Sequence, residues 1–141
     1  MSKVDPRIPA TLEVAEFKYR TDDDGDVIVL LGGFDEDRSQ TVIINSRTYE
    51  YDNEEFRDVF SPAHTGELPP AKVLAYCLKE NNDIKMGSWR LQVSTKTEKV
   101  ALLFGAQISA NASPQRLKQV LLNIAKTTDD LEKKLSSQDK F

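Results

Sequence analysis

A chain of 141 residues has the length of one ordinary domain and can bury a core without disulfides or a structural metal. Its composition, 39% hydrophobic and 30% charged with six glycines and six prolines, excludes a disordered or fibrous chain. The net charge of −4 conceals an asymmetry: residues 1–69 carry 16 acidic and 7 basic side chains, whereas residues 70–141 carry 7 and 12, so the two halves can attract each other.

Several kinds of protein are disfavoured by what the sequence lacks. No apolar run approaches the roughly 20 residues of a membrane span, and the start MSKVDPRIPA has no apolar segment that could act as a signal peptide, so we expect a cytoplasmic protein without a membrane partner. The lysines are scattered with few aromatic residues among them, so we expect no nucleic-acid partner. The single cysteine, Cys77, can form neither an internal disulfide nor a thiolate cluster for zinc.

The first half of the sequence predicts an antiparallel meander. After a short N-terminal arm over residues 1–11, apolar residues alternate weakly in LEVAEFKYR, and an Asp-Gly turn then precedes a β-branched run. A short helix over residues 9–16 is the alternative to the first strand. We expect three strands joined by short polar turns, over residues 12–20, 27–31 and 41–51.

Residues 52–69 are predicted to form a long connection. They are polar and contain Pro62, Gly66 and Pro69, which interrupt regular structure. One helical turn within this segment, at NEEFRDVF, is left open as an alternative.

A helix is predicted to follow this connection, because Pro70 is suited to a first helical turn. Asn81 or Asn82 can end the helix by adopting a left-handed conformation. The apolar side chains of one helix face recur between these points at a spacing of three or four residues: Val73, Leu74, Cys77 and Leu78.

The rest of the chain predicts a second hairpin and a long helix. Apolar residues alternate over 89–93 and again over 100–108, on either side of the turn STKTEK. Ser113 is a strong helix start, because a capping side chain precedes a proline at the first helical position. The tail over residues 136–141 has little to bury and is expected to fray. One apolar helix face lies between: Leu117, Val120, Leu121, Ile124, Thr128, Leu131 and Leu135.

These elements predict a single α+β domain over residues 12–135. We expect an antiparallel sheet of about five strands, with a helix inserted after the third strand and a long C-terminal helix packed on one face.

The second half of the sequence resembles the YbjN family and, more distantly, the type III secretion chaperones of the Tir-chaperone kind. In those families a helix ends in an Asn-containing turn, a short Gly-containing strand and an apolar strand follow, and a capping residue introduces the last helix. The corresponding residues here are Leu74, Leu78, Asn81, Asn82, Gly87, Trp89, Leu91, the strand 100–108, and the helix face from Leu117 to Leu135.

The resemblance implies an α+β domain that binds proteins, is often dimeric and has no catalytic machinery. Those families usually begin with a substantial helix, whereas only about ten residues precede the first apolar stretch here.

Three apolar residues are candidates for a partner-binding surface. Trp89 is either a core anchor opposite the last helix, which its alternation with neighbouring residues favours, or an exposed aromatic residue at an interface. Leu122 lies off the main face of the last helix, and Leu103 points away from the apolar face of its strand. Because a second copy of the chain could cover such surface, we expect a homodimer.

The acidic turn DDDGD, residues 22–26, is the candidate metal site, because clustered carboxylates bind calcium. The spacing departs from an EF-hand loop, since the first ligand position and the closing glutamate are replaced by Arg20 and Leu31. In a meander this turn lies at the same end of the sheet as residues 52–55, so a composite site stays open, although solvated turn carboxylates are the favoured interpretation. The candidate ligands are Asp22, Asp24, Asp26, Asp52, Glu54 and Glu55.

An enzyme is the remaining possibility. Cys77 lies on the apolar helix face and is expected to be a core residue, not a nucleophile. His64, the single histidine, has no second imidazole for a zinc site and no evident nucleophile beside it. We therefore expect no catalytic residues and no cofactor.

The function we expect is non-enzymatic protein binding of a chaperone-like or regulatory adaptor kind, with apolar sheet and helix surfaces contacting an unknown protein partner. A calcium-responsive binding protein that uses the acidic loops is the alternative.

Overall fold

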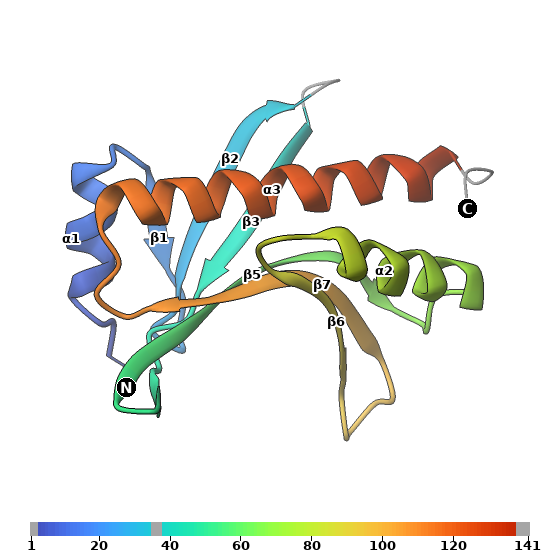
Figure 1. Cartoon of the computed structure of the whole chain (residues 1–141), viewed down its shortest axis with the longest axis horizontal. Coiled ribbons are helices and arrows are strands. Elements are labelled where there is room, and N and C mark those ends of the chain that lie inside the picture. The colour runs from blue at the N-terminus through green and yellow to red at the C-terminus, as the bar shows by residue number, and fades with distance from the viewer. Residues whose placement is uncertain (1–2, 35–37, 138–141) are drawn as a thin grey trace.

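The described part of the chain is built from helices and strands (Figure 1). The computed structural model describes residues 3–34 and 38–137, which form three helices and seven strands. In chain order these elements are α1 (Arg7–Val14), β1 (Tyr19–Thr21), β2 (Val27–Phe34), β3 (Arg38–Ile44), β4 (Tyr49–Tyr51), β5 (Glu54–Gly66), α2 (Ala71–Asp83), β6 (Ser88–Val93), β7 (Val100–Ser109) and α3 (Pro114–Ser137).

The strands form one antiparallel sheet in the order β1-β2-β3-β5-β7-β6, and β4 pairs with the start of β5. The predicted fold class is confirmed: this is an α+β domain in which α2 is inserted before the last hairpin and α3 packs against the sheet. The described residues form seven strands where about five were predicted. The third predicted strand is two strands, β3 and β4, and β5 lies where a connection was predicted.

The hydrophobic core lies between the helices and one face of the sheet. Side chains alternate along each strand, so Val29 is fully buried while its neighbour Leu30 is 66% exposed. The buried strand residues form one cluster with Leu12 of α1, Cys77 of α2 and Leu121 of α3. All three helices therefore pack on the same face, and α3 runs across the strands (Figure 1).

The opposite face of the sheet is called the open face here. Alternate residues of each strand belong to it: Arg20, Ile28, Leu30, Thr41, Ile43, Tyr49, Glu54, Phe56, Asp58, Phe60, Arg90, Leu103, Gly105 and Gln107. None of these residues belongs to the core cluster under the helices. Within the described residues, no helix covers this face.

Helix α3 begins where the sequence predicts it. The Ser113 hydroxyl accepts a hydrogen bond from the Arg116 backbone N–H at 3.1 Å, which satisfies one of the free donors of the first turn. Five of the residues predicted to face the sheet are buried in the core: Leu117, Val120, Leu121, Ile124 and Leu131. Burial of each such side chain contributes about 1.5–3 kcal/mol, so this contact is a major part of the fold's stability.

The N-terminal segment is a helix followed by a short strand. Of the two alternatives for this region, the structure has the helix, at Arg7–Val14, and the strand is limited to Tyr19–Thr21. Part of the segment predicted as an arm over residues 1–11 thus lies in α1, where Ile8 is buried in the core. At the other end, α3 continues to Ser137, and the remainder of the predicted tail lies outside the described residues.

Strand β5 replaces the long connection that the sequence predicts, and it is the longest strand described. Asp52 and Asn53 both have positive φ, 51° and 68°, and join β4 to β5 in a two-residue turn. Two consecutive residues with positive φ are typical of a type I′ hairpin turn, most often formed by Asn-Gly or Asp-Gly. This turn contains no glycine, so the sequence pattern did not indicate a hairpin here. The long connection predicted over residues 52–69 is therefore wrong, and so is its alternative, a helical turn at residues 53–60.

Helix α2 also ends differently from the prediction. Asn81 and Asn82 remain helical, and neither has a positive φ; the helix continues to Asp83, and Ile84 is extended. The left-handed residue of this connection is Gly87, at φ 84°, which lets the chain enter β6. The Asn81 side chain instead hydrogen-bonds to the backbone of Trp89.

Candidate functional site

The open face has a polar centre built from four strands. Asp58 of β5 accepts a hydrogen bond from Gln107 of β7, with Nε2 3.2 Å from Oδ1. The Tyr49 hydroxyl of β4 lies 3.5 Å from the same oxygen, and Nη1 of Arg90 lies 3.7 Å from it. Burial and the Asp58 carboxylate raise the pKa of Tyr49, so its phenol stays a proton donor. A single carboxylate oxygen is therefore approached by three donors.

Arg90 lies flat on the sheet because the next strand carries a glycine at this point. A Cβ atom at Gly105 would collide with Nη2 of Arg90. The guanidinium crosses β7 toward Asp58, and its Nε and Nη2 atoms are buried without a hydrogen-bond partner among the described residues.

A hollow of about 420 Å³ lies beside Arg90, which is one of its lining residues. Leu103, which is 6% exposed, and Phe60 supply apolar surface, and the side chains of two amides lie beside them. The complete lining is Asn45, Asp58, Phe60, Arg90, Leu91, Gln92 and Leu103. The hollow therefore combines apolar surface with one cationic and one anionic side chain, those of Arg90 and Asp58.

A second hollow, of about 380 Å³, lies at the other edge of the open face. Ile28 and Leu30 supply its apolar surface, and Lys18 and Arg20 of the β1 region line it as well. Neither cation has an ion pair within the described part of the chain. The open face thus has apolar surface with cations near both of its edges.

A network of ion pairs on the helix side holds the N-terminal segment in place. Arg57 of β5 is 2% exposed, and its Nη2 lies 2.7 Å from Oδ2 of Asp5. Arg7 donates to Asp5 and, through both terminal nitrogens, to Glu55 at 2.9 and 3.0 Å. The hydrogen bonds from Arg7 hold the pKa of Asp5 well below its usual range, despite its burial, with a further contribution from Arg57.

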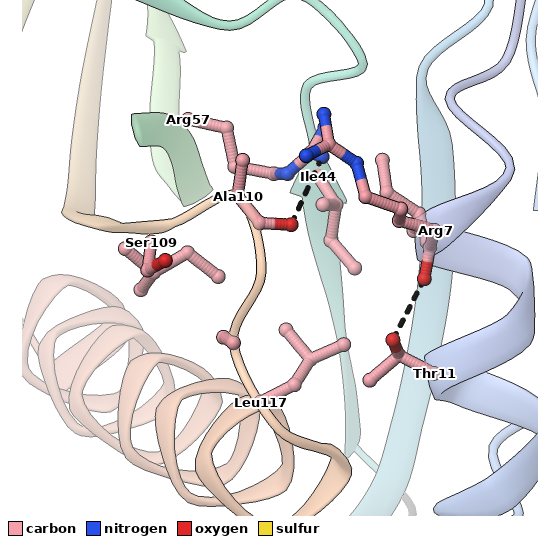
Figure 2. A pocket seen from close by; sticks show the side chains of 10 residues that line it. Arg7, Thr11, Ile44, Arg57, Ser109, Ala110 and Leu117 are labelled. Atoms are coloured by element: carbon pink, nitrogen blue, oxygen red, sulfur yellow. Dashed lines mark hydrogen bonds between the residues drawn. The ribbon is translucent and has the colours of Figure 1, made fainter. Parts of the chain in front are cut away.

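The same region encloses very little free volume, and Figure 2 shows the side chains that line it. Arg57 reaches the Ala110 carbonyl, at 3.4 Å from Nη2, while Arg7 approaches from α1. The cavity between them measures about 10 Å³, the volume of a single water-sized probe. This region is therefore a structural joint and does not accommodate a ligand.

The three residues predicted to bind a partner lie in three different places. Leu103 lies in the hollow of the open face. Trp89 is 5% exposed on the helix side, where its Nε1 donates to Glu80 at 2.7 Å, so the core interpretation agrees with the structure. Leu122 is 47% exposed on the outer side of α3.

Three of the six acidic residues predicted as metal ligands, Asp22, Asp26 and Glu55, accept hydrogen bonds from other groups of the protein. Asp22 Oδ1 accepts from the backbone N–H groups of Asp24 and Asp26, both at 2.9 Å. Glu55 is held by Arg7 and by the Thr48 hydroxyl, whose hydrogen bonds lower its pKa to about 2. Across residues 3–34 and 38–137, no group of three or more His, Cys, Asp or Glu side chains could hold a metal ion.

Cys77 and His64, the two residues considered for catalysis, contact groups that hold the fold together. Cys77 is 3% exposed, and burial, together with the nearby Glu80 carboxylate, raises the pKa of its thiol to about 12. A ring nitrogen of His64 lies 2.8 Å from the Glu67 carbonyl oxygen. Neither residue is arranged as an activated nucleophile.

Sequence reasoning missed Arg90 and Asp58 as a pair. Arg90 alternates with Trp89 along β6 and so belongs to the open face, a signal that the sequence contains. Asp58 could not be placed on this face from the sequence, because its strand was not predicted.

Comparison with known proteins finds no family model and no curated protein that matches this chain. None of the helices in the described residues is long and apolar enough to cross a membrane.

Proposed function

We propose that this chain is a non-enzymatic protein-binding module and that its partner lies on the open face. The observation that carries this proposal is an uncovered sheet face with apolar side chains. A sheet with one face in solvent normally alternates apolar and polar residues, yet Ile28, Leu30, Ile43 and Phe60 lie on the uncovered side here. Exposed apolar surface of this kind marks interaction sites.

The chaperone-like or adaptor character is part of the same proposal. It is supported by the resemblance of the second half to the YbjN family and the secretion chaperones, and by the order of elements, in which a meander, a helix, a hairpin and a long helix follow a first helix. Fold alone does not establish function. The proposal also keeps the expected cytoplasmic location.

A homodimer is a second part of the proposal. Leu78 on α2 and Val93 on β6 are 71% and 56% exposed and lie outside the open face. They offer apolar surface to a second copy while the open face remains free for another protein.

The test compares three leucines changed to lysine. Tagged wild-type protein and the Leu30→Lys, Leu78→Lys and Leu122→Lys variants are used to capture proteins from extract of the source cells, and light scattering gives the mass of each. We expect one stoichiometric partner, retained by Leu78→Lys and Leu122→Lys and lost by Leu30→Lys. Loss with Leu122→Lys alone would move the contact to α3, and recovery of no partner by any form would refute the proposal.

A further inference from the structure

We propose that two copies of the chain pair edge to edge through β6, so that their sheets join in antiparallel fashion about a two-fold axis at Gln92. The inference rests on the homodimer of the proposed function and deepens it, because it names the strand, the register and the contacts. The open face of each copy stays available to another protein.

The first argument is the direction of the backbone groups along β6. The N–H and C=O of Trp89 point away from β7, because a side chain of α2 hydrogen-bonds to both. The N–H of Ser94 points the other way, to the Lys99 carbonyl at 2.9 Å. These directions alternate along a strand, so Leu91 and Val93, like Trp89, direct both groups to the side of β6 where the described residues form no strand.

The second argument is that this part of the edge is unprotected. Sheet edges are normally protected by lysine, proline, a bulge or a covering segment. The β6–β7 register is continuous, and residues 91–93 are Leu, Gln and Val, without charge or proline. Leu91 is 40% exposed and Val93 is 56% exposed. An apolar edge with free backbone groups is a site for strand pairing.

The third argument is that the edge is complementary to itself in one register. If Leu91 lies opposite Val93 of the second copy, both residues enter hydrogen-bonded pairs, and each such pair exchanges both of its N–H···O bonds. A register that places Leu91 opposite Leu91 sets Val93 against Trp89, whose backbone groups are already bound within the chain. The opposite shift sets Leu91 against Thr95, which lies beyond the end of β6. The favoured register is two-fold symmetric, as in most contacts between identical chains.

The fourth argument is the apolar surface beside this edge. Leu91 and Val93 lie on the helix side of the sheet, as Trp89 does. A two-fold axis perpendicular to the sheet keeps the helices of both copies on one side, so Leu91 of one copy packs there against Val93 of the other. Leu78, which is 71% exposed, is a neighbour of Asn81 on the surface of α2. Asn81 contacts the edge of β6, so Leu78 lies on the side of the helix nearest to the second copy.

The fifth argument is that this register brings no like charges together. Like charges directly opposite each other destabilise a pair of strands. Gln92 lies opposite its own copy, and Arg90 lies opposite Ser94 of the second copy, so the paired residues face each other without repulsion.

The first test is a disulfide across the two-fold axis. Opposite residues of a non-hydrogen-bonded antiparallel pair have Cα atoms about 4.5 Å apart, which is within the range that a disulfide spans. Gln92→Cys in the full-length chain should therefore form a covalent dimer under mild oxidation, seen by non-reducing electrophoresis and mass spectrometry.

The matched control is Ser94→Cys, at an exposed residue of the same hairpin. In this register Ser94 lies roughly 13 Å from its own copy, so this variant should cross-link at least tenfold more slowly. Cross-linking of both variants at the same rate, or of neither, would overturn the inference.

The second test removes one backbone donor without affecting the sheet within a copy. The N–H of Val93 points away from β7, and proline is tolerated at such edge positions. Sedimentation over a concentration series should show a wild-type mass near twice 15.9 kDa and at least a tenfold higher dimer Kd for Val93→Pro. Val93→Thr, which keeps the N–H and the branched shape, should stay within about threefold of the wild type. Circular dichroism checks that both variants are folded, and the disulfide test decides the question if Val93→Pro does not fold.

The outcomes separate this inference from the proposed function. A wild-type chain that stays monomeric at every concentration overturns both the edge pairing and the homodimer, whereas capture of a partner that depends on Leu30 still supports protein binding by the open face. A dimer with an unchanged Kd for Val93→Pro and no cross-link for Gln92→Cys keeps the homodimer and overturns pairing through β6.

Discussion

Asn81 makes with Trp89 the two hydrogen bonds that a neighbouring strand would make. Its Oδ1 accepts from the Trp89 backbone N–H at 2.7 Å, and its Nδ2 donates to the Trp89 carbonyl at 3.2 Å. Strand β6 is at the edge of the sheet, where unpaired backbone groups invite pairing with another chain. A side chain of α2 thus covers part of this edge.

Replacing Asn81 by Ala should lower the free energy of unfolding by about 1–3 kcal/mol, because two backbone groups of a buried residue lose their partners. Urea denaturation measures this change, and Asn82→Ala, its exposed neighbour, is the matched control. An equal effect of both substitutions would show that the hydrogen bonds to Trp89 contribute nothing specific.

Replacing Asp5 by Ala should destabilise the protein by about 3 kcal/mol, because it leaves the buried guanidinium of Arg57 without its counter-ion. Asp23→Ala, an exposed acidic residue of the first turn, should change stability by less than about 0.5 kcal/mol. The midpoint of thermal unfolding reports both. A destabilisation by Asp5→Ala no larger than that of Asp23→Ala would contradict the ion-pair network.

The stability of the fold should fall at acidic pH. Burial acts to raise the pKa of Asp129, but the hydrogen bonds from Arg38 and Gln40 more than offset it, so the pKa is lowered in the folded protein. A carboxylate with a lowered folded pKa stabilises the fold above its unfolded value of about 4, and this contribution is lost as pH falls toward the folded value. We expect Tm to be nearly constant from about pH 8 to 5 and to decrease from about pH 5 to 2.

Two variants assign this decrease to its source. Asp129→Asn should have a lower Tm at pH 7 and a shallower decrease below about pH 5. Asp130→Asn, the exposed neighbour on α3, should follow the wild-type curve. Parallel curves for wild type and Asp129→Asn would refute the role of Asp129.

The Cys77 thiol should react slowly with a disulfide reagent in the folded protein. It is buried, and its pKa of about 12 leaves almost no thiolate at pH 8. We expect labelling in the folded protein to be at least a hundredfold slower than in urea. The absorbance of the thiolate released from the reagent measures both rates. A folded-state rate equal to that of glutathione would return Cys77 to the list of reactive residues.

Calcium should leave the thermal stability unchanged. Oδ1 of Asp22 accepts from two backbone N–H groups and both carboxylate oxygens of Glu55 accept from Arg7, so calcium binding through these oxygens would break these contacts. Differential scanning fluorimetry with calcium and with a chelator measures this. A calcium-dependent rise in Tm that Asp22→Asn abolishes would restore the alternative of a calcium-responsive protein.

Much of the fold can be predicted from local sequence patterns, but strand β5 and its long-range contacts cannot. Alternation in β6 and β7 places Trp89 under the helices and Leu103 on the opposite face, since successive side chains of a strand point to opposite faces. Strand β5 was not predicted, because the turn before it lacks glycine and because a buried arginine, Arg57, interrupts the apolar alternation. The counter-ion of Arg57 is Asp5, 52 residues earlier, and no periodicity reports a pair so far apart.

The pairing of β5 with β7 also joins residues that are far apart in the sequence. Their register joins Phe56 to Ser109 and Gly66 to Val100, with α2 and β6 in the intervening chain. A ladder of this kind closes a loop of more than 30 residues before its first pair can form, whereas the β4–β5 and β6–β7 hairpins close over short turns. Completion of the β5–β7 ladder is therefore expected to be the slow step of folding, and until it forms the core-facing residues of both halves remain in water.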